Sequence, residues 1–270
     1  MKIGLHYSIS SNNNGPGKVV KNLIKGLNLL DIEVISNEIC EYNGILQLNY
    51  NALNYCNDTT LIGPNICVLP NEIPFIWTKF KKHIVPSDWV CSLYRSFDIT
   101  KNNDIFVWPV GIDTDTFIDF EKKPKYDVLI YCKNRSNELD NILNYLNHKG
   151  LTHITLIYGK YSEEEFIQKA NDCKVCILLT KTESQGIAYQ EILSMNRPCY
   201  VLNKDKWDDY GIVFDATSVP YFDYTCGMIA SDINFFEYFY ENKNYKPREY
   251  IINNLSLLKQ ASKYIELLRL

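Results

Sequence analysis

Strand-like and helix-like segments alternate along nearly the whole sequence, and this alternation constrains the fold more than any other feature. Short apolar runs with the character of buried strands are followed by longer segments whose apolar residues recur at helical spacing. This order is typical of α/β proteins built on parallel sheets. We predict strands at 2–7, 32–36, 45–49, 60–62, 83–85, 105–108, 127–132, 153–158, 175–180, 199–202 and 212–214, and helices at 19–30, 88–97 (capped by Ser87), 135–148, 162–172, 186–195, 231–241 and 255–270.

A charged segment at 111–127, which contains Pro124, interrupts the pattern before it starts again. We interpret this segment as a linker. The predicted fold is therefore α/β, with two Rossmann-like lobes facing a cleft. The predicted domains are an N-terminal lobe at 1–123, a C-terminal lobe at 124–250, and a helix at 251–270 that packs back on the first lobe.

Composition excludes several classes of protein. A net charge of −4 argues against a nucleic-acid binder, which normally carries a basic face. Four of the nine cysteines (Cys67, Cys132, Cys176 and Cys199) lie inside apolar runs, and the pair Cys173 and Cys176 has no second pair to complete a zinc site. We find no signal-peptide pattern and no apolar stretch of membrane-spanning length, so a cytoplasmic protein is expected.

The segment after the predicted strand 175–180 is the most informative for function. Glu183 lies in a loop and Glu191 about a turn inside the following helix. The amides of the first helical turn can hold an anion, and a carboxylate can hold a ribose diol. Acidic residues at a helix start are also common for purely structural reasons. The position beyond the carboxyl end of a strand, where α/β sheets bind ligands, favours a nucleotide-sugar site.

A glycine turn, Gly15-Pro-Gly17-Lys, opens the first predicted helix. The P-loop pattern fails because Asn12 and Val19 occupy two of its required positions, and the dinucleotide fingerprint fails at Val20. With the asparagines at 12–14, the turn can present amides to an anion or a sugar. An ordinary strand-to-helix turn explains the segment equally well.

The segment 75–83 (FIWTKFKKH) mixes aromatic residues with lysines. Such a face can stack on glycans or lie on an anionic membrane surface. An amphipathic helix with a solvated lysine edge is the preferred interpretation, and peripheral membrane contact is the alternative.

Four motifs occur in order: PSDWV at 86–90, WPVGIDTDTF at 108–117, LIYGKY at 156–161 and ESQGIAYQE at 183–191. Together they resemble motifs of the retaining, family 4-like glycosyltransferases that use nucleotide sugars and have the GT-B fold. The resemblance implies that the first lobe, which is short for the family, serves the acceptor and that the second binds the nucleotide-sugar donor.

The resemblance also assigns roles to individual residues. Glu183 matches the first acid of the Glu-x7-Glu motif, beside the donor sugar, and Glu191 matches the second, which holds the ribose. Lys133 or Arg135 matches the basic residue on the diphosphate, and the sequence leaves the choice between them open. The other implied contacts are the turn that closes over the donor, the loop near the nucleobase and the amides that meet the phosphates or sugar: Gly15 and Gly17; Gly159, Lys160 and Tyr161; Gln185, Gly186 and Ile187.

On the acceptor side, many members of the family have a histidine that this sequence does not clearly supply. His6, at the end of the first predicted strand, could reach the cleft, whereas His83 and His153 are predicted to be structural. The segment 62–65 (IGPN), predicted as a loop, could replace the histidine.

The predicted function is transfer of a sugar, with retention, from a UDP- or GDP-linked donor to a glycan or another hydroxyl acceptor. No metal or other cofactor is expected, because the Asp113-Thr-Asp115 triplet lies in the linker motif. The alternatives are a sugar-nucleotide-binding module without turnover and a sugar-nucleotide epimerase on the same fold. The oligomeric state is left open.

Overall fold

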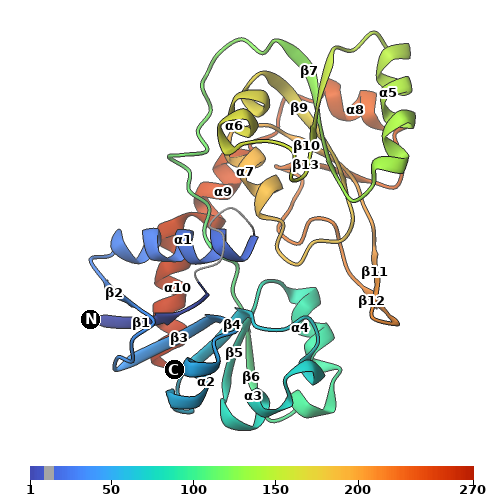
Figure 1. Cartoon of the computed structure of the whole chain (residues 1–270). Coiled ribbons are helices and arrows are strands. Elements are labelled where there is room, and N and C mark those ends of the chain that lie inside the picture. The colour runs from blue at the N-terminus through green and yellow to red at the C-terminus, as the bar shows by residue number, and fades with distance from the viewer. Residues whose placement is uncertain (9–14) are drawn as a thin grey trace. The chain divides into compact units, whose positions relative to one another are not determined.

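The computed structural model describes residues 1–8 and 15–270, so the predicted contribution of the asparagines at 12–14 lies outside the described residues. The chain divides into two compact units (Figure 1). Unit 1 consists of Met1–Gly111 and Leu255–Leu270, and unit 2 of Ile112–Asn254.

Unit 1 contains a sheet of six parallel strands in the order β2-β1-β3-β4-β5-β6. Its first strand pairs with β2 on one side and β3 on the other, so the direction of winding reverses between β1 and β3. The elements of this unit are β1 (Lys2–His6), α1 (Gly15–Asn28), β2 (Glu33–Ser36), β3 (Tyr42–Gln47), α2 (Tyr50–Tyr55), β4 (Leu61–Asn65), η1 (Pro70–Glu72), α3 (Pro74–Lys79), β5 (Lys82–Val85), α4 (Asp88–Arg95), η2 (Asp98–Thr100), β6 (Asp104–Val107) and α10 (Leu257–Arg269).

Helix α10 is separated from the rest of unit 1 in the sequence but packs against it. Trp108 Nε1 donates a hydrogen bond to the Gln260 carbonyl oxygen at 2.9 Å. Gly26 of α1 lies so close to α10 that a Cβ at this position would be 2.8 Å from the Leu257 carbonyl oxygen. The side chain of Tyr264 is fully buried. A glycine is therefore what allows the two helix backbones to approach each other.

Unit 2 contains five parallel strands in the order β13-β10-β9-β7-β8, and its winding reverses between β7 and β9. A separate antiparallel hairpin, β11–β12, follows β10. The elements are β7 (Tyr126–Lys133), η3 (Ser136–Glu138), α5 (Leu139–His148), β8 (His153–Ile157), α6 (Glu163–Asn171), β9 (Cys173–Thr180), α7 (Ile187–Ser194), β10 (Cys199–Leu202), β11 (Lys206–Asp209), β12 (Ile212–Asp215), β13 (Gly227–Ala230), α8 (Phe236–Glu241) and α9 (Pro247–Leu255).

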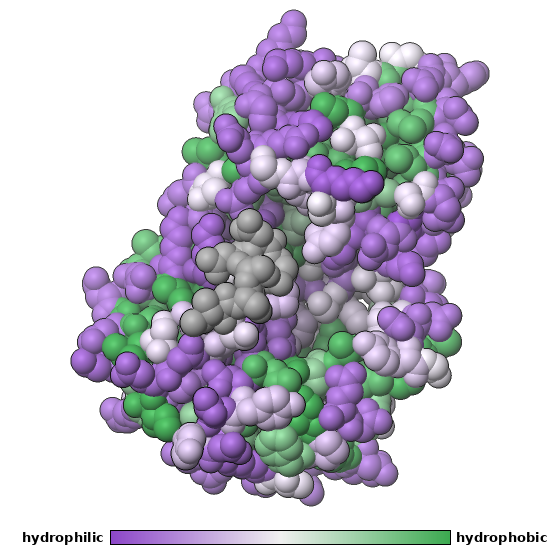
Figure 2. All heavy atoms as spheres, viewed as in Figure 1, coloured by the Kyte–Doolittle hydropathy of each residue, from purple (hydrophilic) through white to green (hydrophobic). Residues whose placement is uncertain are grey.

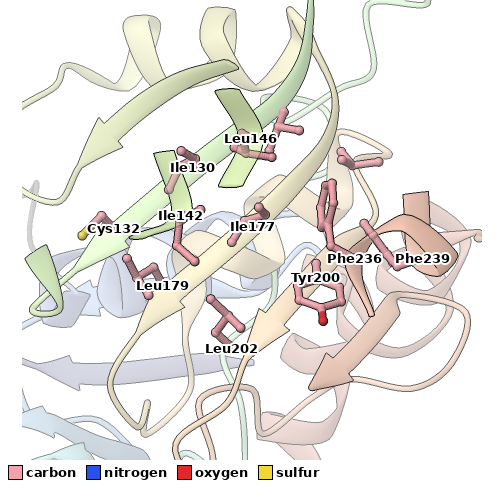
Figure 3. Packing of buried hydrophobic residues seen from close by; sticks show 12 residues of the cluster. Ile130, Cys132, Ile142, Leu146, Ile177, Leu179, Tyr200, Leu202, Phe236 and Phe239 are labelled. Atoms are coloured by element: carbon pink, nitrogen blue, oxygen red, sulfur yellow. The ribbon is translucent and has the colours of Figure 1, made fainter. Parts of the chain in front are cut away.

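The core on one face of this sheet is formed by side chains of β7, β9 and β10 that pack against α5 and α8 (Figure 3). Phe236 and Phe239 of α8 lie against Tyr200, with ring centroids 5.4 Å apart in both cases. The strands carry apolar residues on both faces, as expected for a parallel sheet covered by helices on each side.

Four sequence predictions in these units need correction. The predicted strand 212–214 forms, but it pairs with β11 in the hairpin instead of joining the main sheet. The fifth strand of that sheet is β13, which was not predicted. The segment 62–65 belongs to β4 and is not a loop. Ser87 occupies the cap position of α4, yet among the described residues its side chain makes no capping hydrogen bond.

The segment at 75–83 is packed inward to a large extent. Trp77 is buried and stacks on His83 with ring centroids 4.0 Å apart. Lys79 Nζ donates to the Asn54 carbonyl oxygen at 2.9 Å, and Lys82 Nζ donates to that of Leu268 at 3.1 Å. The groups that suggested a glycan-binding or membrane-binding face are thus largely engaged within unit 1.

The predicted α/β class with two Rossmann-like parallel sheets is confirmed, with six strands in one unit and five in the other. On the face drawn in Figure 2, hydrophobic residues form separate patches between hydrophilic ones. Across residues 1–8 and 15–270, no helix has the length and apolar character needed to span a membrane.

Candidate functional site

The central pair of the candidate site lies where the winding of the unit 2 sheet reverses. Lys133 ends β7 and Thr180 ends β9, and the two residues are partners in the register of these neighbouring strands. Glu183 lies in the loop that follows β9. Lys133 Nζ is 2.8 Å from Glu183 Oε1 and 2.9 Å from Oε2. Ligands of open α/β sheets bind at this carboxyl edge, so the ion pair lies where a ligand is expected.

The surroundings of the pair leave it partly open to solvent. The side chains of Lys133 and Glu183 are 25% and 13% exposed. Lys133 Nζ also lies 4.7 Å from the centroid of the Tyr158 ring, which follows β8 and is itself exposed. Burial raises the pKa of Glu183, and the charge and hydrogen bond of Lys133 oppose this rise. The positive charge of Lys133 thus offsets part of the effect of burial on the Glu183 carboxyl group.

Arg135 has a different environment, although it is only two residues from Lys133. Its side chain is buried, with 4% exposure. Nε donates to Glu138 Oε1 at 2.8 Å, and Nη1 donates to the carbonyl oxygens of Thr180, at 3.0 Å, and Leu202. The guanidinium therefore ties together the ends of β9 and β10, which leaves Lys133 as the more accessible of the two predicted cations.

The start of α7 requires glycine. Gly186 has a φ of +80°, and a Cβ built there would be 2.1 Å from the Tyr189 ring. Gln185 is buried, and its Nε2 donates to Gln190 Oε1 at 3.1 Å, which holds the loop against the helix. Helix geometry leaves the first-turn amides, including that of Ile187, without partners within the helix. The first turn carries no acidic residue, so its electrostatic environment favours an anion.

Glu191 and the loop after β8 lie within electrostatic reach of each other. Burial raises the pKa of Tyr161 to about 12, and the negative charge of Glu191 contributes to the rise. Glu191 is 1% exposed. Tyr161 stacks on Phe166, with centroids 5.3 Å apart, and donates to Tyr131 Oη at 3.2 Å. Tyr161, which belongs to the predicted nucleobase loop, is thus held in an aromatic cluster within electrostatic reach of Glu191, the residue predicted to bind the ribose.

The other residues of this loop are more open. Gly159 has a φ of +78°, with no atom within 4 Å of a Cβ built there. Lys160 is exposed. The structure therefore places the predicted residues of unit 2 at the end of β7, on the loops after β7, β8 and β9, and on α7. Of the two predicted cations, Arg135 is buried and Lys133 is partly open to solvent.

A segment that the sequence analysis did not single out supports the same edge. Thr217 accepts a hydrogen bond on its carbonyl oxygen from the Glu183 amide at 3.0 Å. Ser218 is fully buried, and its Oγ donates to the Thr180 carbonyl oxygen at 3.3 Å. Asn203 Oδ1 accepts hydrogen bonds from the Ser218 amide at 2.9 Å and from Thr217 Oγ1 at 3.1 Å. Because Asn203 follows the strand-like run 199–202, the rule that sites lie after strands could have pointed to it. Thr217 and Ser218 are brought there by the return of the hairpin, which the sequence did not indicate.

In unit 1, the predicted glycine turn opens α1 after β1. Gly15 is the first residue of α1, with open space around a Cβ built there, and Gly17 is buried. This position is next to the point where the winding of the sheet reverses. His6 is buried, lies 3.3 Å from Asn43 Oδ1 through its Nε2, and has its pKa lowered by burial. The idea that His6 is available to an acceptor is therefore wrong for this structure, because the ring is part of the core.

Asp113 of the linker motif has a local structural role. Its Oδ1 accepts from the Thr116 amide at 3.2 Å and its Oδ2 from Thr116 Oγ1 at 2.7 Å. These bonds are those of a turn closed by an aspartate side chain.

Comparison with known proteins relates this architecture to one group of enzymes. No family model and no curated protein matches the sequence. A sucrose-phosphate synthase from Thermosynechococcus elongatus has a similar structure, with a TM-score of 0.65 and 10% identity over 99% of this chain and 98% of that chain. A glycosyltransferase from Rickettsia africae gives a TM-score of 0.62 and 12% identity over 99% and 97%. A mutant of TarM from S. aureus, solved with Fondaparinux, alpha-GlcNAc-glycerol and UDP, gives 0.50 and 14% over 93% and 58%. The predicted GT-B fold is confirmed by this likeness.

Proposed function

We propose that this protein is a glycosyltransferase that moves a sugar from a nucleoside-diphosphate sugar to a hydroxyl acceptor, with retention of anomeric configuration. The observation that carries the proposal is the Lys133–Glu183 ion pair at the carboxyl edge of β7 and β9, next to the start of α7. The fold shared with glycosyltransferases supports the same conclusion. A cation, a carboxylate and unpaired helix amides are the groups that a sugar diphosphate needs.

In this proposal unit 2 binds the nucleotide-sugar donor. Glu191 holds the ribose hydroxyls, and the loop of Gly159, Lys160 and Tyr161 lies by the base. The amides at the start of α7 and Lys133 meet the diphosphate, while Glu183 orients hydroxyls of the transferred sugar. A uridine diphosphate is the first choice, because one structural neighbour was solved with UDP, and a guanosine diphosphate is the second.

The reaction breaks the bond between the anomeric carbon and the diphosphate oxygen and forms a bond from that carbon to the acceptor oxygen. Negative charge accumulates on the departing diphosphate in an oxocarbenium-like transition state. Lys133 and the α7 amides stabilise this charge more in the transition state than in the ground state. The departing phosphate takes the acceptor's proton, so attack occurs on the face from which the leaving group departs. No metal ion is part of the proposal.

Nucleotide binding tests the donor assignment first. Thermal unfolding would be measured with UDP, GDP, ADP and CMP and their common sugar conjugates, on the wild type and on Glu191→Gln. A ligand at a hundredfold its dissociation constant adds ~2.7 kcal/mol to the free energy of unfolding, which corresponds to a shift of several degrees. We expect one base to stabilise the wild type and to stabilise Glu191→Gln much less. If none of these nucleotides changes the melting temperature, the proposal is refuted.

Product analysis then separates transfer from its two alternatives. A sugar-nucleotide-binding module would bind the same nucleotide but release no sugar, and an epimerase would return an altered sugar nucleotide from donor alone. A transferase releases nucleoside diphosphate and gives a glycoside whose anomeric configuration, read by NMR, equals that of the donor. An inverted product would refute retention but not transfer.

A further inference from the structure

The β11–β12 hairpin extends from the unit 2 sheet directly after β10 (Figure 1). Its two strands pair antiparallel, with Trp207 opposite Phe214 and Asp209 opposite Ile212. Because side chains alternate between the faces of a strand, these four residues share one face. We refer to this face, together with Tyr210 at the tip, as the aromatic face of the hairpin. The opposite face carries Lys206, Asp208, Val213 and Asp215, all exposed.

The base of the hairpin is tied to the candidate donor site. The Ala216 amide donates to the Asp205 carbonyl oxygen at 2.9 Å and closes the base. The next residue, Thr217, accepts from the Glu183 amide at 3.0 Å. The Lys204 amide donates to Ser218 Oγ at 3.0 Å. The hairpin is therefore rooted in the loop that carries Glu183.

The tip holds an aromatic residue in a conformation that such residues rarely adopt. Tyr210 and Gly211 form the two-residue turn, with φ values of 52° and 73°. Positive φ at both positions is what a type I′ hairpin turn requires, and asparagine, aspartate or glycine normally occupies the first of them. A tyrosine there is a local cost to the turn. Strained residues of this kind concentrate at functional sites.

The ring of Tyr210 extends the apolar surface of the hairpin. It stacks on Trp207 with an interplanar angle of 25° and a centroid distance of 6.2 Å, and Tyr210 remains 58% exposed. Two nearly parallel rings thus lie in sequence along the hairpin. The Asp209 carboxylate lies on the same face as Trp207, and Asp209 Oδ1 accepts from the Tyr210 amide at 2.9 Å.

The chemistry of this face selects among ligands. Residues 204–215 contain four aspartates and two lysines, so the phosphates of nucleic acid and of an anionic membrane are disfavoured. The C–H face of a sugar ring packs on an aromatic ring, and its hydroxyls donate to carboxylates. Aromatic rings next to a carboxylate fit an uncharged carbohydrate.

We propose that the aromatic face of the β11–β12 hairpin is a carbohydrate-binding site, which holds the acceptor glycan beside the nucleotide-sugar site of unit 2. The binding of carbohydrate is argued from the hairpin alone. That the bound carbohydrate is the acceptor rests on the proposed transferase function.

The turn itself supplies a decisive variant. Tyr210→Asn removes the exposed ring but places at the tip a residue that adopts positive φ readily, so the hairpin should fold at least as well as in the wild type. Val213→Thr, on the opposite face and 65% exposed in the wild type, is the matched control. Full-length protein would be applied to an array of neutral gluco-, manno-, galacto- and N-acetylglucosamine oligosaccharides. Affinities for the bound members would then be measured by calorimetry.

We expect Tyr210→Asn to weaken oligosaccharide binding by about tenfold, with unchanged or higher melting temperature. Trp207→Leu should weaken it further, and Val213→Thr should bind as the wild type does. An array without any bound oligosaccharide, or equal affinity in Tyr210→Asn, would overturn the proposal. So would a change of sedimentation coefficient in the hairpin variants, because the aromatic face would then be a contact between copies of the chain.

Nucleotide-induced thermal shifts, recorded on the same proteins, keep this inference distinct from the proposed function. Wild type that binds a nucleotide but no oligosaccharide would refute the hairpin site and leave the transferase proposal standing. Wild type that binds oligosaccharides but no nucleotide would refute the transferase proposal and leave the hairpin site standing. We expect both to bind, with the nucleotide response unchanged in Tyr210→Asn.

Discussion

Two cations separated by one residue have different environments in this protein. Lys133 ends a strand at the partly open edge of the sheet, whereas Arg135 turns inward to Glu138 and two carbonyl oxygens. Between them Asn134 has a φ of 60°, which redirects the chain between the two cations. The sequence placed both cations after a strand but could not distinguish them, because that backbone turn and the partners of Arg135 depend on tertiary structure.

Replacing each cation by methionine should therefore have different effects. Lys133→Met should reduce turnover by roughly 10²–10³-fold with a much smaller change in nucleotide affinity, because it removes stabilisation of the leaving group. Arg135→Met should instead lower the free energy of unfolding by roughly 2–3 kcal/mol, because Glu138 and two carbonyl oxygens lose their partner. Steady-state kinetics and urea unfolding measure the two effects.

Glu138→Gln serves as a control for the effect on stability. It weakens the ion pair with Arg135 but keeps the hydrogen bonds of Arg135 to the ends of β9 and β10. A stable Arg135→Met with low turnover would reassign the catalytic cation to Arg135.

His83 should make unit 1 sensitive to acid. Burial lowers the pKa of His83 to about 4, from an ordinary value near 6.5, while the ring stacks on Trp77. The unfolded chain therefore binds the proton more readily, so the contribution of neutral His83 is present above pH 6.5 and is lost as the pH falls towards 4. The loss amounts to roughly 3 kcal/mol.

Urea unfolding followed by tryptophan fluorescence between pH 7 and pH 4 measures this loss. His83→Gln should be less stable at pH 7 but should lose less on acidification, whereas His148→Gln, an exposed position, should follow the wild type. Equal pH dependence in His83→Gln would exclude His83 as the cause.

At the scale of elements, the start of α7 requires glycine at position 186. Gly186→Ala must accommodate both the positive φ and a Cβ against the Tyr189 ring, and it should cost roughly 1–3 kcal/mol of unfolding free energy. Gly159→Ala is a matched control, since its φ is nearly the same but the space around its Cβ is open. Chemical denaturation of both variants compares them. If the two lose equal stability, the contact with Tyr189 has no part in the requirement for glycine.

The order of elements could largely be predicted, because buried parallel strands are continuous apolar runs and the helices between them are amphipathic. The strand 212–214 has the same local pattern as a sheet strand, so only pairing could show that it belongs to a hairpin. The opposite error concerns β13. This strand begins at Gly227, which has a φ of 146° and no room for a Cβ beside the Cys199 carbonyl oxygen. The glycine weakens the strand pattern in the sequence, and only the pairing with β10 shows that the segment is a strand.

The sequence predicted which individual loops carry the residues of the candidate site, but not which of these residues contact each other. Glu183, Glu191 and the cations follow strands, and the carboxyl ends of parallel strands share one edge. The ion pair joins residues fifty positions apart, and its geometry follows from the reversal of winding between β7 and β9. That reversal is a property of strand order, which periodicity does not encode.

At the scale of the whole molecule, α10 should control the stability of unit 1. Gly26→Val places a branched side chain against the Leu257 carbonyl oxygen and Ala261 Cβ, so α1 and α10 must separate. We expect a loss of roughly 2–4 kcal/mol in the unfolding of unit 1, and no change for unit 2. Hydrogen exchange read by mass spectrometry resolves the two units. Asn28→Ala, at the exposed end of α1, should leave both unchanged, and faster exchange in unit 2 of Gly26→Val would contradict the prediction.

The return of α10 to unit 1 also sets an order of events on the ribosome. Residues 112–254 form one uninterrupted stretch of nascent chain, so unit 2 has all its parts before α10 is translated. Unit 1 emerges earlier but lacks the helix that covers Gly26 and bonds to Trp108. Unit 1 is therefore begun before unit 2 but completed after it, and in that interval its uncovered apolar surface is available to a chaperone.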